Sequence, residues 1–339
     1  MNTIARESVS EIADAALLAR PVRPIPTTLT CILPAYNEAD TLPRLIPELA
    51  EALSRLAEEI CILVVDDGSQ DETEVVVAML ARDYPVQLLQ LSRNFGKENA
   101  ITAGLDHADG DVVVIMDADG QHPVSLLRDF VNHWRAGADM VYGVREDRED
   151  QPGWRRWASN SFYRLIGHNA SIDIHANAGD FRLMDRSVVD AIRELPEYNR
   201  FMKGIYSWVG FKAVAIPFQV QERRAGHSHF NLTRLSRLAL DGLFSFSDTP
   251  LRLASATGVV ISMGSIFYGL YIALRTVIEG VDLPGWATLT VGMTLLSGIQ
   301  LLCIGILGEY VGRIFSEVKH RPHYIVRRRL DFHREPTER

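Results

Sequence analysis

Short apolar runs alternate with longer helical stretches through the first half of the chain. The short runs are rich in β-branched and other apolar residues, and each is followed by a stretch long enough for a helix. Strands that alternate with helices in this way predict parallel βαβ units with right-handed crossovers. The predicted strands cover residues 29–33, 60–65, 86–91, 112–116 and 140–142, and the predicted helices cover residues 41–57, 71–83, 97–107 and 123–136.

Polar and acidic residues follow four of the predicted strands. Ligands of a parallel sheet bind beyond the carboxyl ends of its strands, so these four loops are expected to converge on one rim. In chain order the loops read Pro34-Ala35-Tyr36-Asn37-Glu38, Asp66-Asp67-Gly68-Ser69, Arg93-Asn94-Phe95-Gly96-Lys97 and Asp117-Ala118-Asp119-Gly120-Gln121.

The stretch 151–222 is less regular and is rich in arginine, which suits a site for a second anionic partner. We interpret residues 28–230 as one α/β domain. Residues 1–27 lack the apolar centre of a signal peptide and are expected to form a mobile arm.

Two long apolar stretches, about 253–274 and 286–307, are each long enough at roughly 20 residues to cross a bilayer as a helix. The loop between them is short, so residues 251–309 are predicted to form a two-helix transmembrane hairpin. Basic residues precede the first stretch and follow the second, which predicts that both termini and the α/β domain are cytoplasmic. Residues 310–339 are then a cytoplasmic basic juxtamembrane helix and tail, and the protein is a multi-pass protein of the inner membrane.

Residues 231–250 carry apolar positions at helical spacing, with Arg234, Arg237 and Asp241 elsewhere around the helix. This pattern is typical of an amphipathic helix that lies in the membrane interface. A core helix of the α/β domain has the same pattern and is the alternative.

The chain has 339 residues and a formal net charge of -8, which argues against nucleic acid as a partner. Its three cysteines, Cys31, Cys61 and Cys303, lie in apolar runs at distant positions. They are interpreted as buried, reduced thiols of a protein that faces the cytosol.

Asp117 and Asp119 offer two carboxylates in a turn directly after an apolar strand, and Gln121 adds a neutral oxygen. A divalent cation on such oxygen ligands stabilises a departing diphosphate as a Lewis acid. Asp66 and Asp67 occupy the equivalent place after another strand. They are interpreted as acceptors for a nucleotide base or ribose, or as a turn and helix cap, and both roles are compatible.

These loop motifs resemble the family 2 glycosyltransferases of GT-A fold. Motifs in the second half are similar to those of polyprenyl-phosphate glycosyltransferases, a group that includes bactoprenol glucosyltransferases and, more distantly, dolichyl-phosphate mannose synthases. They are Gly179-Asp180-Phe181-Arg182, Asn199-Arg200-Phe201-Met202-Lys203-Gly204, Glu222-Arg223-Arg224-Ala225-Gly226 and the run from Gly305 to Arg313. The resemblance implies a Rossmann-like, mixed and mainly parallel sheet flanked by helices.

The resemblance also implies inverting transfer of a sugar, expected to be glucose, from a UDP-sugar to undecaprenyl phosphate, and assembly as a homotetramer. Asp119, Gln121 and Asp117 would hold Mg²⁺ or Mn²⁺, and Asp117, Asp119 and Arg200 would carry catalysis. The nucleotide would be held by Pro34, Ala35, Tyr36, Glu38, Asp66, Asp67, Asn94, Lys97, Asp117 and Ala118.

Guanidinium groups match phosphate geometry, so Arg145, Arg182, Arg200 and Arg223 are expected to bind the acceptor phosphate, with Ser228 close by. The chain departs from the family pattern at Gly120 and His122, and at His227 and His229, where lysines are usual. Histidines therefore flank Ser228 in place of lysines, and how the chain binds the acceptor phosphate there requires a test.

Three alternatives remain. A GDP-mannose-dependent polyprenyl-phosphate mannose synthase would use the same residues. A processive polysaccharide synthase would need a Gln-x-x-Arg-Trp element, which the spacing of Gln151 and Arg156-Trp157 does not provide. A non-catalytic sugar-nucleotide-binding scaffold is disfavoured by the intact carboxylates of Asp117 and Asp119.

Overall fold

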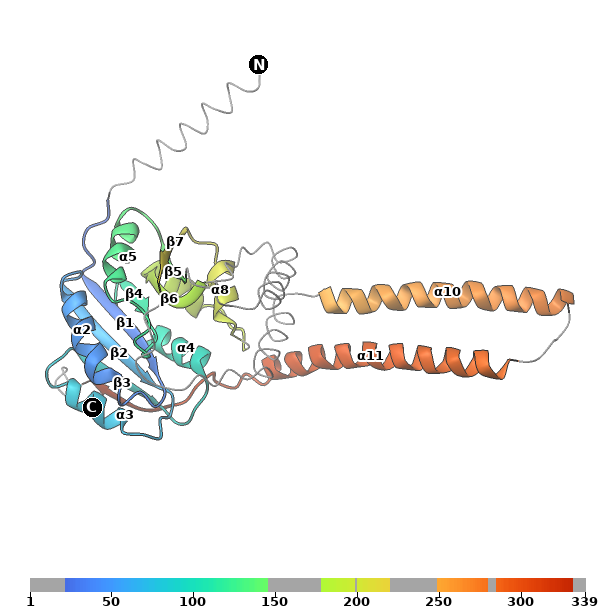
Figure 1. Ribbon diagram of the computed structural model, residues 1–339, viewed down its shortest axis with the longest axis horizontal. Coiled ribbons are helices and arrows are strands. Elements are labelled where there is room, and N and C mark those ends of the chain that lie inside the picture. The colour runs from blue at the N-terminus through green and yellow to red at the C-terminus, as the bar shows by residue number, and fades with distance from the viewer. Residues whose placement is uncertain (1–21, 146–177, 199, 220–248, 280–284, 332–339) are drawn as a thin grey trace, which may run out of the picture. The chain divides into compact units, whose positions relative to one another are not determined.

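A computed structural model describes residues 22–145, 178–198, 200–219, 249–279 and 285–331 (Figure 1). Residues 231–248 of the predicted interfacial helix and two predicted acceptor residues, Arg223 and Ser228, lie outside the described residues, and residues 249 and 250 begin the helix α10. The chain divides into two compact units. The first contains the described residues up to 219 together with 322–331, and the second contains 249–279 and 285–321.

The first unit is built on an eight-stranded sheet with the strand order β7-β5-β6-β4-β1-β2-β3-β8. The strands β1 to β4 are parallel to one another, and β7 is parallel to β5, whereas β6 and β8 run antiparallel to their neighbours. The predicted mixed, mainly parallel α/β sheet is therefore confirmed. The strands span Thr28–Ala35 (β1), Glu59–Asp66 (β2), Val86–Leu91 (β3), Val112–Ile115 (β4), Met140–Arg145 (β5), Ala178–Asp185 (β6), Ala213–Phe218 (β7) and Val326–Asp331 (β8).

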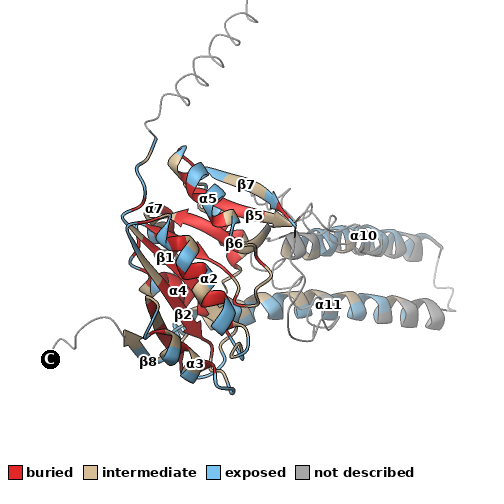
Figure 2. Cartoon of the chain, turned by 60° about the vertical axis from the view of Figure 1, so that its left-hand side comes forward, coloured by how far each residue is buried: buried red, intermediate tan, exposed pale blue. Residues whose placement is uncertain are grey.

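Helices cover the sheet, and the central strands are buried (Figure 2). Apolar side chains of α2 and α5 recur at three- and four-residue spacing and pack with one face of the sheet in the main core. On α4, a Cβ at Gly104 would lie 2.4 Å from Ile32 Cγ2, so glycine permits this helix to lie directly on β1. The helices span Leu42–Ser54 (α2), Thr73–Leu80 (α3), Lys97–His107 (α4), Leu126–Arg135 (α5), Arg186–Arg193 (α7) and Met202–Trp208 (α8).

The C-terminal strand β8 was not anticipated by the sequence analysis, which ended the α/β domain at residue 230. It pairs antiparallel with β3, and Leu330 packs against the main core. Its sequence contains three consecutive arginines, which is typical of a solvated tail. The backbone pairing that places the segment in the sheet produces no periodic pattern in its sequence.

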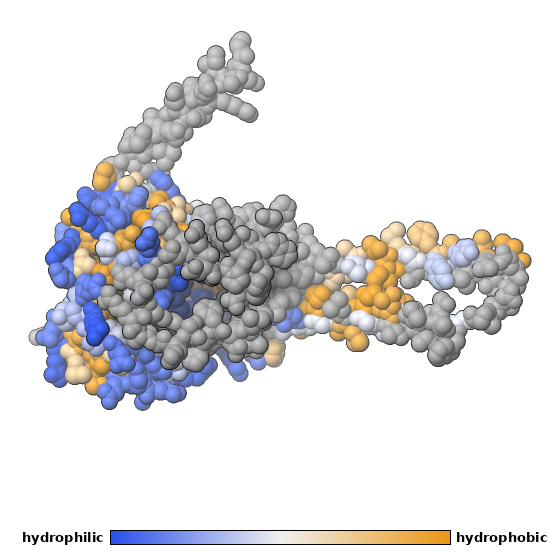
Figure 3. Space-filling model, viewed as in Figure 1, coloured by the Kyte–Doolittle hydropathy of each residue, from blue (hydrophilic) through white to orange (hydrophobic). Residues whose placement is uncertain are grey.

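The second unit consists of two long helices, α10 (Thr249–Glu279) and α11 (Trp286–Val318), which lie side by side (Figures 1 and 2). Large apolar side chains are exposed along both helices (Figure 3). Within the described residues, one segment, Leu295–Val318, is long and apolar enough to cross a membrane. It overlaps the second predicted span, and the first predicted span, 253–274, lies within α10.

Candidate active site

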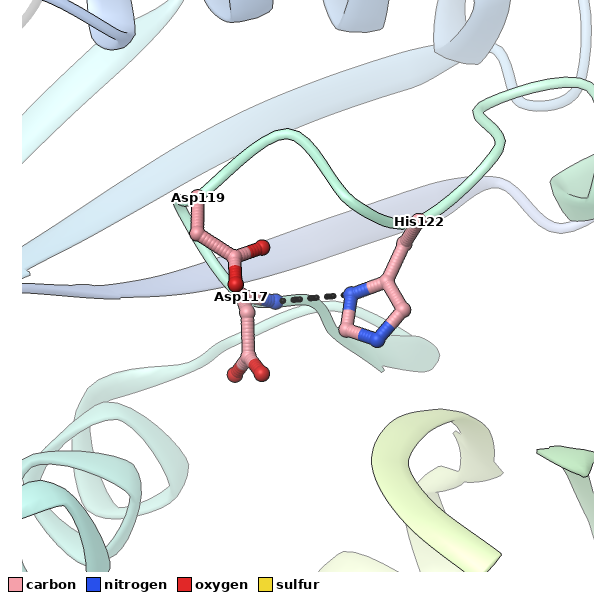
Figure 4. A group of neighbouring side chains, drawn as sticks. All are labelled: Asp117, Asp119 and His122. Atoms are coloured by element: carbon pink, nitrogen blue, oxygen red, sulfur yellow. Dashed lines mark hydrogen bonds between the residues drawn. The ribbon is translucent and has the colours of Figure 1, made fainter. Parts of the chain in front are cut away.

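Asp117, Asp119 and His122 lie in the turn that follows β4, at the carboxyl end of the central parallel strands (Figure 4). One possible ligand atom from each side chain lies within 4.8 Å of the others. The turn is closed locally, because the backbone N–H of Gln121 donates to Asp119 Oδ1 over 3.0 Å. The two predicted carboxylates thus lie close together with His122 beside them, and the role of the Gln121 side chain stays a prediction.

His122 is held in place by its surroundings. Its Nδ1 accepts a hydrogen bond from the backbone N–H of Asp117 at 3.4 Å, as Figure 4 shows, and its ring stacks on Phe181 with centroids 4.7 Å apart. Burial lowers the pKa of His122, so the neutral ring that can accept this bond is favoured. Sequence reasoning noted this residue as a departure from the family pattern but did not include it in the site.

Lys97 links Asp117 to a carboxylate on another strand. Its Nζ lies 2.6 Å from Asp117 Oδ1 and 2.7 Å from Asp180 Oδ2, which joins the start of α4, the β4 loop and strand β6. Burial would lower the pKa of Lys97, but the two carboxylates outweigh it and raise that pKa. For Asp180, burial is likewise outweighed by Lys97, and the pKa of the carboxyl is lowered. Lys97 and Asp180 are therefore charged at neutral pH.

Behind this ion pair lies a second group of charged side chains. Glu98 Oε2 accepts a hydrogen bond from the backbone N–H of Met202 at 3.3 Å, and burial raises the pKa of Glu98 to about 7. The Arg182 guanidinium lies 3.3 Å over the Tyr206 ring and donates to Gly179 O at 2.7 Å. Arg182 is only 3% exposed, so its guanidinium lies in the interior in this structure, and its contact with an acceptor phosphate stays a prediction.

The other predicted acceptor arginines lie in different surroundings. Arg145 ends β5, and its positive charge contributes to the lowered pKa of His122. Arg200 donates to Leu195 O at 2.7 Å. Whether these side chains gather around a phosphate stays a prediction.

The predicted nucleotide loops after β1 and β2 are tied together by side chains. The backbone N–H of Asn37 donates to Ser69 Oγ at 2.9 Å, and that of Gln70 donates to Asn37 Oδ1 at 2.8 Å. Asn37 has a positive φ of 57°, a conformation that asparagine tolerates better than most residues. These bonds leave the neighbouring Tyr36 exposed at the rim, where the sequence predicted it to pack beside a base.

Asp66 and Asp67 are interior residues, 0% and 4% exposed. Asp66 accepts from Ser69 N at 2.9 Å and from Gln90 Nε2 at 3.2 Å. Asp67 accepts from the backbone N–H groups of Phe95 and Gly96 at 2.7 and 2.9 Å. Burial raises the pKa of Asp67, an effect that the two N–H donors partly offset. Within the described structure, both residues hold loops in shape, which is the turn role that the sequence left open.

Known proteins share both the first unit and the C-terminal helices. The model of the family "Glycosyl transferase family 2" matches residues 30–193. An uncharacterized glycosyltransferase of Synechocystis is 42% identical over 299 residues, 88% of this chain and 94% of the relative. The chain belongs to glycosyl transferase family 2. It is therefore a glycosyltransferase, as the sequence motifs predicted.

Other relatives in family 2 carry more specific names. A bactoprenol glucosyl transferase of Shigella phage SfV is 41% identical over 300 residues, 88% of this chain and 98% of the relative. Among solved structures, mannosyl-3-phosphoglycerate synthase from Rubrobacter xylanophilus is 22% identical, with a TM-score of 0.45 and coverage of 63% of this chain and 71% of that chain. The bactoprenol glucosyl transferases match over almost their whole length and over 88% of this chain, so the similarity extends through α10 and into α11.

Proposed function

We propose that this glycosyltransferase transfers glucose, with inversion, from UDP-glucose to a polyprenyl phosphate at the cytoplasmic face of a membrane. The observation that carries the proposal is the 41% identity to bactoprenol glucosyl transferases over 97–98% of their length. A shared catalytic unit alone would leave the acceptor open, whereas similarity that continues through α10 and into α11 favours a lipid acceptor.

The carboxylates of Asp117 and Asp119 fit a divalent cation. They lie at the carboxyl end of a central strand with possible ligand atoms within 4.8 Å, and carboxylate oxygens favour Mg²⁺ or Mn²⁺. Asp117 Oδ1 is paired with Lys97, so Asp117 Oδ2 and Asp119 are the carboxylate oxygens that we assign to the cation, with Gln121 as the third ligand. When bound, the cation would neutralise charge on the departing diphosphate.

The remaining groups position the two substrates. Tyr36, Glu38, Asn94 and Lys97 lie on the loops where we place the nucleotide, and the interior Asp66 and Asp67 keep those loops in shape. A phosphate monoester has a second pKa of about 6, so the acceptor is already anionic at neutral pH and needs no strong general base. Catalysis then rests on holding this oxygen near the sugar and on neutralising charge, and we propose Arg145, Arg182, Arg200 and Arg223 as the cationic groups that bind the acceptor phosphate.

We further propose that α10 and α11 both cross the membrane and that the termini and the first unit are cytoplasmic. The exposed apolar side chains of both helices and the basic residues outside them support this arrangement. The resemblance to polyprenyl-phosphate glycosyltransferases suggests a tetramer.

The test uses the full-length protein in lipid nanodiscs with undecaprenyl phosphate and radiolabelled UDP-glucose, in Mg²⁺ or Mn²⁺. We expect label in the organic-extractable fraction with UDP-glucose and at most a few per cent of that amount with GDP-mannose. Product from GDP-mannose alone would replace the proposed donor. Label that stays water-soluble with both donors, in protein that binds UDP, would refute the lipid acceptor.

A further inference from the structure

The C-terminal strand β8 follows α11 in the chain and completes the sheet beside β3. Arg328 lies opposite Gln90 in the β3 pairing, and Arg329 lies opposite Leu89. Successive side chains of a strand point to opposite faces, so these two arginines lie on opposite faces of the sheet. Arg328 therefore lies on the same face as its partner Gln90, and Arg329 lies on the other face.

Arg328 begins a chain of polar contacts. Its guanidinium forms an ion pair with Glu74 on α3, and Glu74 Oε2 accepts a hydrogen bond from Gln90 Nε2 at 2.8 Å. The same Nε2 donates to Asp66 Oδ2 at 3.2 Å. An amide nitrogen has two hydrogens, one for each carboxylate, so the orientation of the buried Gln90 depends on both Glu74 and Asp66.

The chain of contacts continues from Asp66 to the surface of the rim. Asp66 Oδ1 accepts from Ser69 N at 2.9 Å, and Ser69 Oγ accepts from the backbone N–H of Asn37 at 2.9 Å. Asn37 lies between Tyr36 and Glu38, two of the residues predicted to hold the nucleotide. A second tie comes from α3, because Thr73, next to Glu74, accepts from Glu38 N at 3.0 Å.

We propose that Arg328 is a positioning residue for the donor nucleotide: through Glu74, Gln90 and Asp66 it holds the loops that carry Tyr36 and Glu38. The inference rests on the proposed function, in which those loops bind UDP. It gives the segment beyond the membrane helices a role in the site, because Arg328 of β8 would support the β1 and β2 loops through Glu74 and Gln90. Arg328 itself touches no substrate in this proposal.

Arg329 provides a matched control. It also links β8 to β3, because its Nη2 donates a hydrogen bond to Gln87 Oε1 at 3.3 Å. Gln87 in turn donates to Asp331, so these contacts lead back to β8 and not to the nucleotide loops. Loss of either arginine removes one surface contact from the same strand pair. A purely structural role of β8 predicts equal effects, whereas the proposed role predicts that only Arg328 affects nucleotide binding.

The experiment measures UDP affinity by calorimetry and the steady-state kinetics of transfer, with the full-length protein in nanodiscs. We expect Arg328→Ala to raise the Kd for UDP and the KM for UDP-glucose about twofold to fivefold, the range for loss of one partly exposed ion pair. Arg329→Ala is expected to leave both constants unchanged, and kcat at saturating donor is expected to stay near the wild-type value in both variants. Arg328→Lys keeps the charge and is expected to restore most of the affinity.

Glu74→Gln tests the route of the effect. The amide can still accept from Gln90 but cannot pair with Arg328, so we expect the same loss of affinity as for Arg328→Ala. The double variant is expected to bind UDP no more weakly than either single variant, because both remove the same interaction. Additive losses in the double variant would overturn the route through Glu74.

Two further outcomes would overturn the inference. Equal Kd values for wild type and Arg328→Ala, or an equal loss in Arg329→Ala, would show that β8 has no specific role in binding while the proposed function stands. Wild-type protein that binds no UDP would refute the proposed donor and this inference together.

Discussion

Two acidic turns at neighbouring positions of the rim have nearly the same sequence character and different surroundings. Asp66 and Asp67 follow β2, and Asp117 and Asp119 follow β4, the two strands that flank β1. The first pair is almost fully buried, with all four carboxylate oxygens bonded to protein donors. The second pair is partly exposed, and its main partners are one Lys97 ammonium and one backbone N–H.

The difference is one of how firmly each carboxylate is held. A carboxylate whose two oxygens each accept a protein hydrogen bond is fixed in orientation, and a ligand can reach only the lone pairs that those donors leave free. Carboxylates that keep oxygens open at the rim can bind a cation with little rearrangement. Burial and bonding therefore distinguish the two turns, and they are the reason for our proposal that the cation binds at the turn after β4.

The largest expected effect is that of Asp119→Asn. Loss of one cation-binding carboxylate should lower kcat/KM for UDP-glucose about 100-fold or more, because removal of one group that stabilises a transition state typically has an effect of this size. The melting temperature should change little, because Asp119 accepts only the local Gln121 N–H. Transfer rates and thermal unfolding of the same preparation provide the measurement. Product formation equal to that of the wild type would remove Asp119 from the cation site.

Asp67→Asn should show the opposite pattern. The amide can accept from only one of the two N–H groups of Phe95 and Gly96, and its own NH₂ faces the other, so we expect a loss of about 1.5–3 kcal/mol in the free energy of unfolding. At low temperature, where the variant stays folded, its kcat should remain within a few-fold of the wild type. A loss of kcat as large as that of Asp119→Asn, without a loss of stability, would contradict the comparison.

Lys97→Met removes the ammonium between Asp117 and Asp180 and leaves two carboxylates without their counter-ion. We expect kcat/KM to fall about tenfold, because an unpaired, partly buried charge disfavours the arrangement of the site. Lys97→Arg keeps the charge and should retain more activity. If Lys97→Met and Lys97→Arg were both as active as the wild type, the ion pair would have no role in the reaction.

The smallest effect concerns pH. Burial raises the pKa of Glu98 to about 7 in the folded protein, above its ordinary value of 4.5, so folding favours the protonated form. The resulting stabilisation is complete below pH 4.5 and is lost as the pH rises through 7. Glu98→Gln mimics the neutral acid and does not titrate. The melting temperature of the variant minus that of the wild type should therefore increase by a few degrees between pH 6 and 8.5. A difference that is constant over this range would show that Glu98 does not titrate there.

Local pattern was sufficient for much of the architecture. The alternation of strands and helices predicted β1 to β5, their mainly parallel order and the meeting of four loops at one rim, because periodicity and strand-end chemistry are properties of short segments. The two carboxylates after β4 and the apolar character of the C-terminal helices were evident for the same reason.

Only the tertiary structure decided how those residues are used. It placed the antiparallel β6 between β4 and β5, which brings Asp180 to Lys97, and it added β8 at the edge of the sheet. It also closed the hydrogen bonds from Gln90, Phe95 and Gly96 to Asp66 and Asp67. Each of these outcomes depends on donors and neighbours that are distant in sequence, and a hydrogen bond across the sheet leaves no pattern in the segment that accepts it.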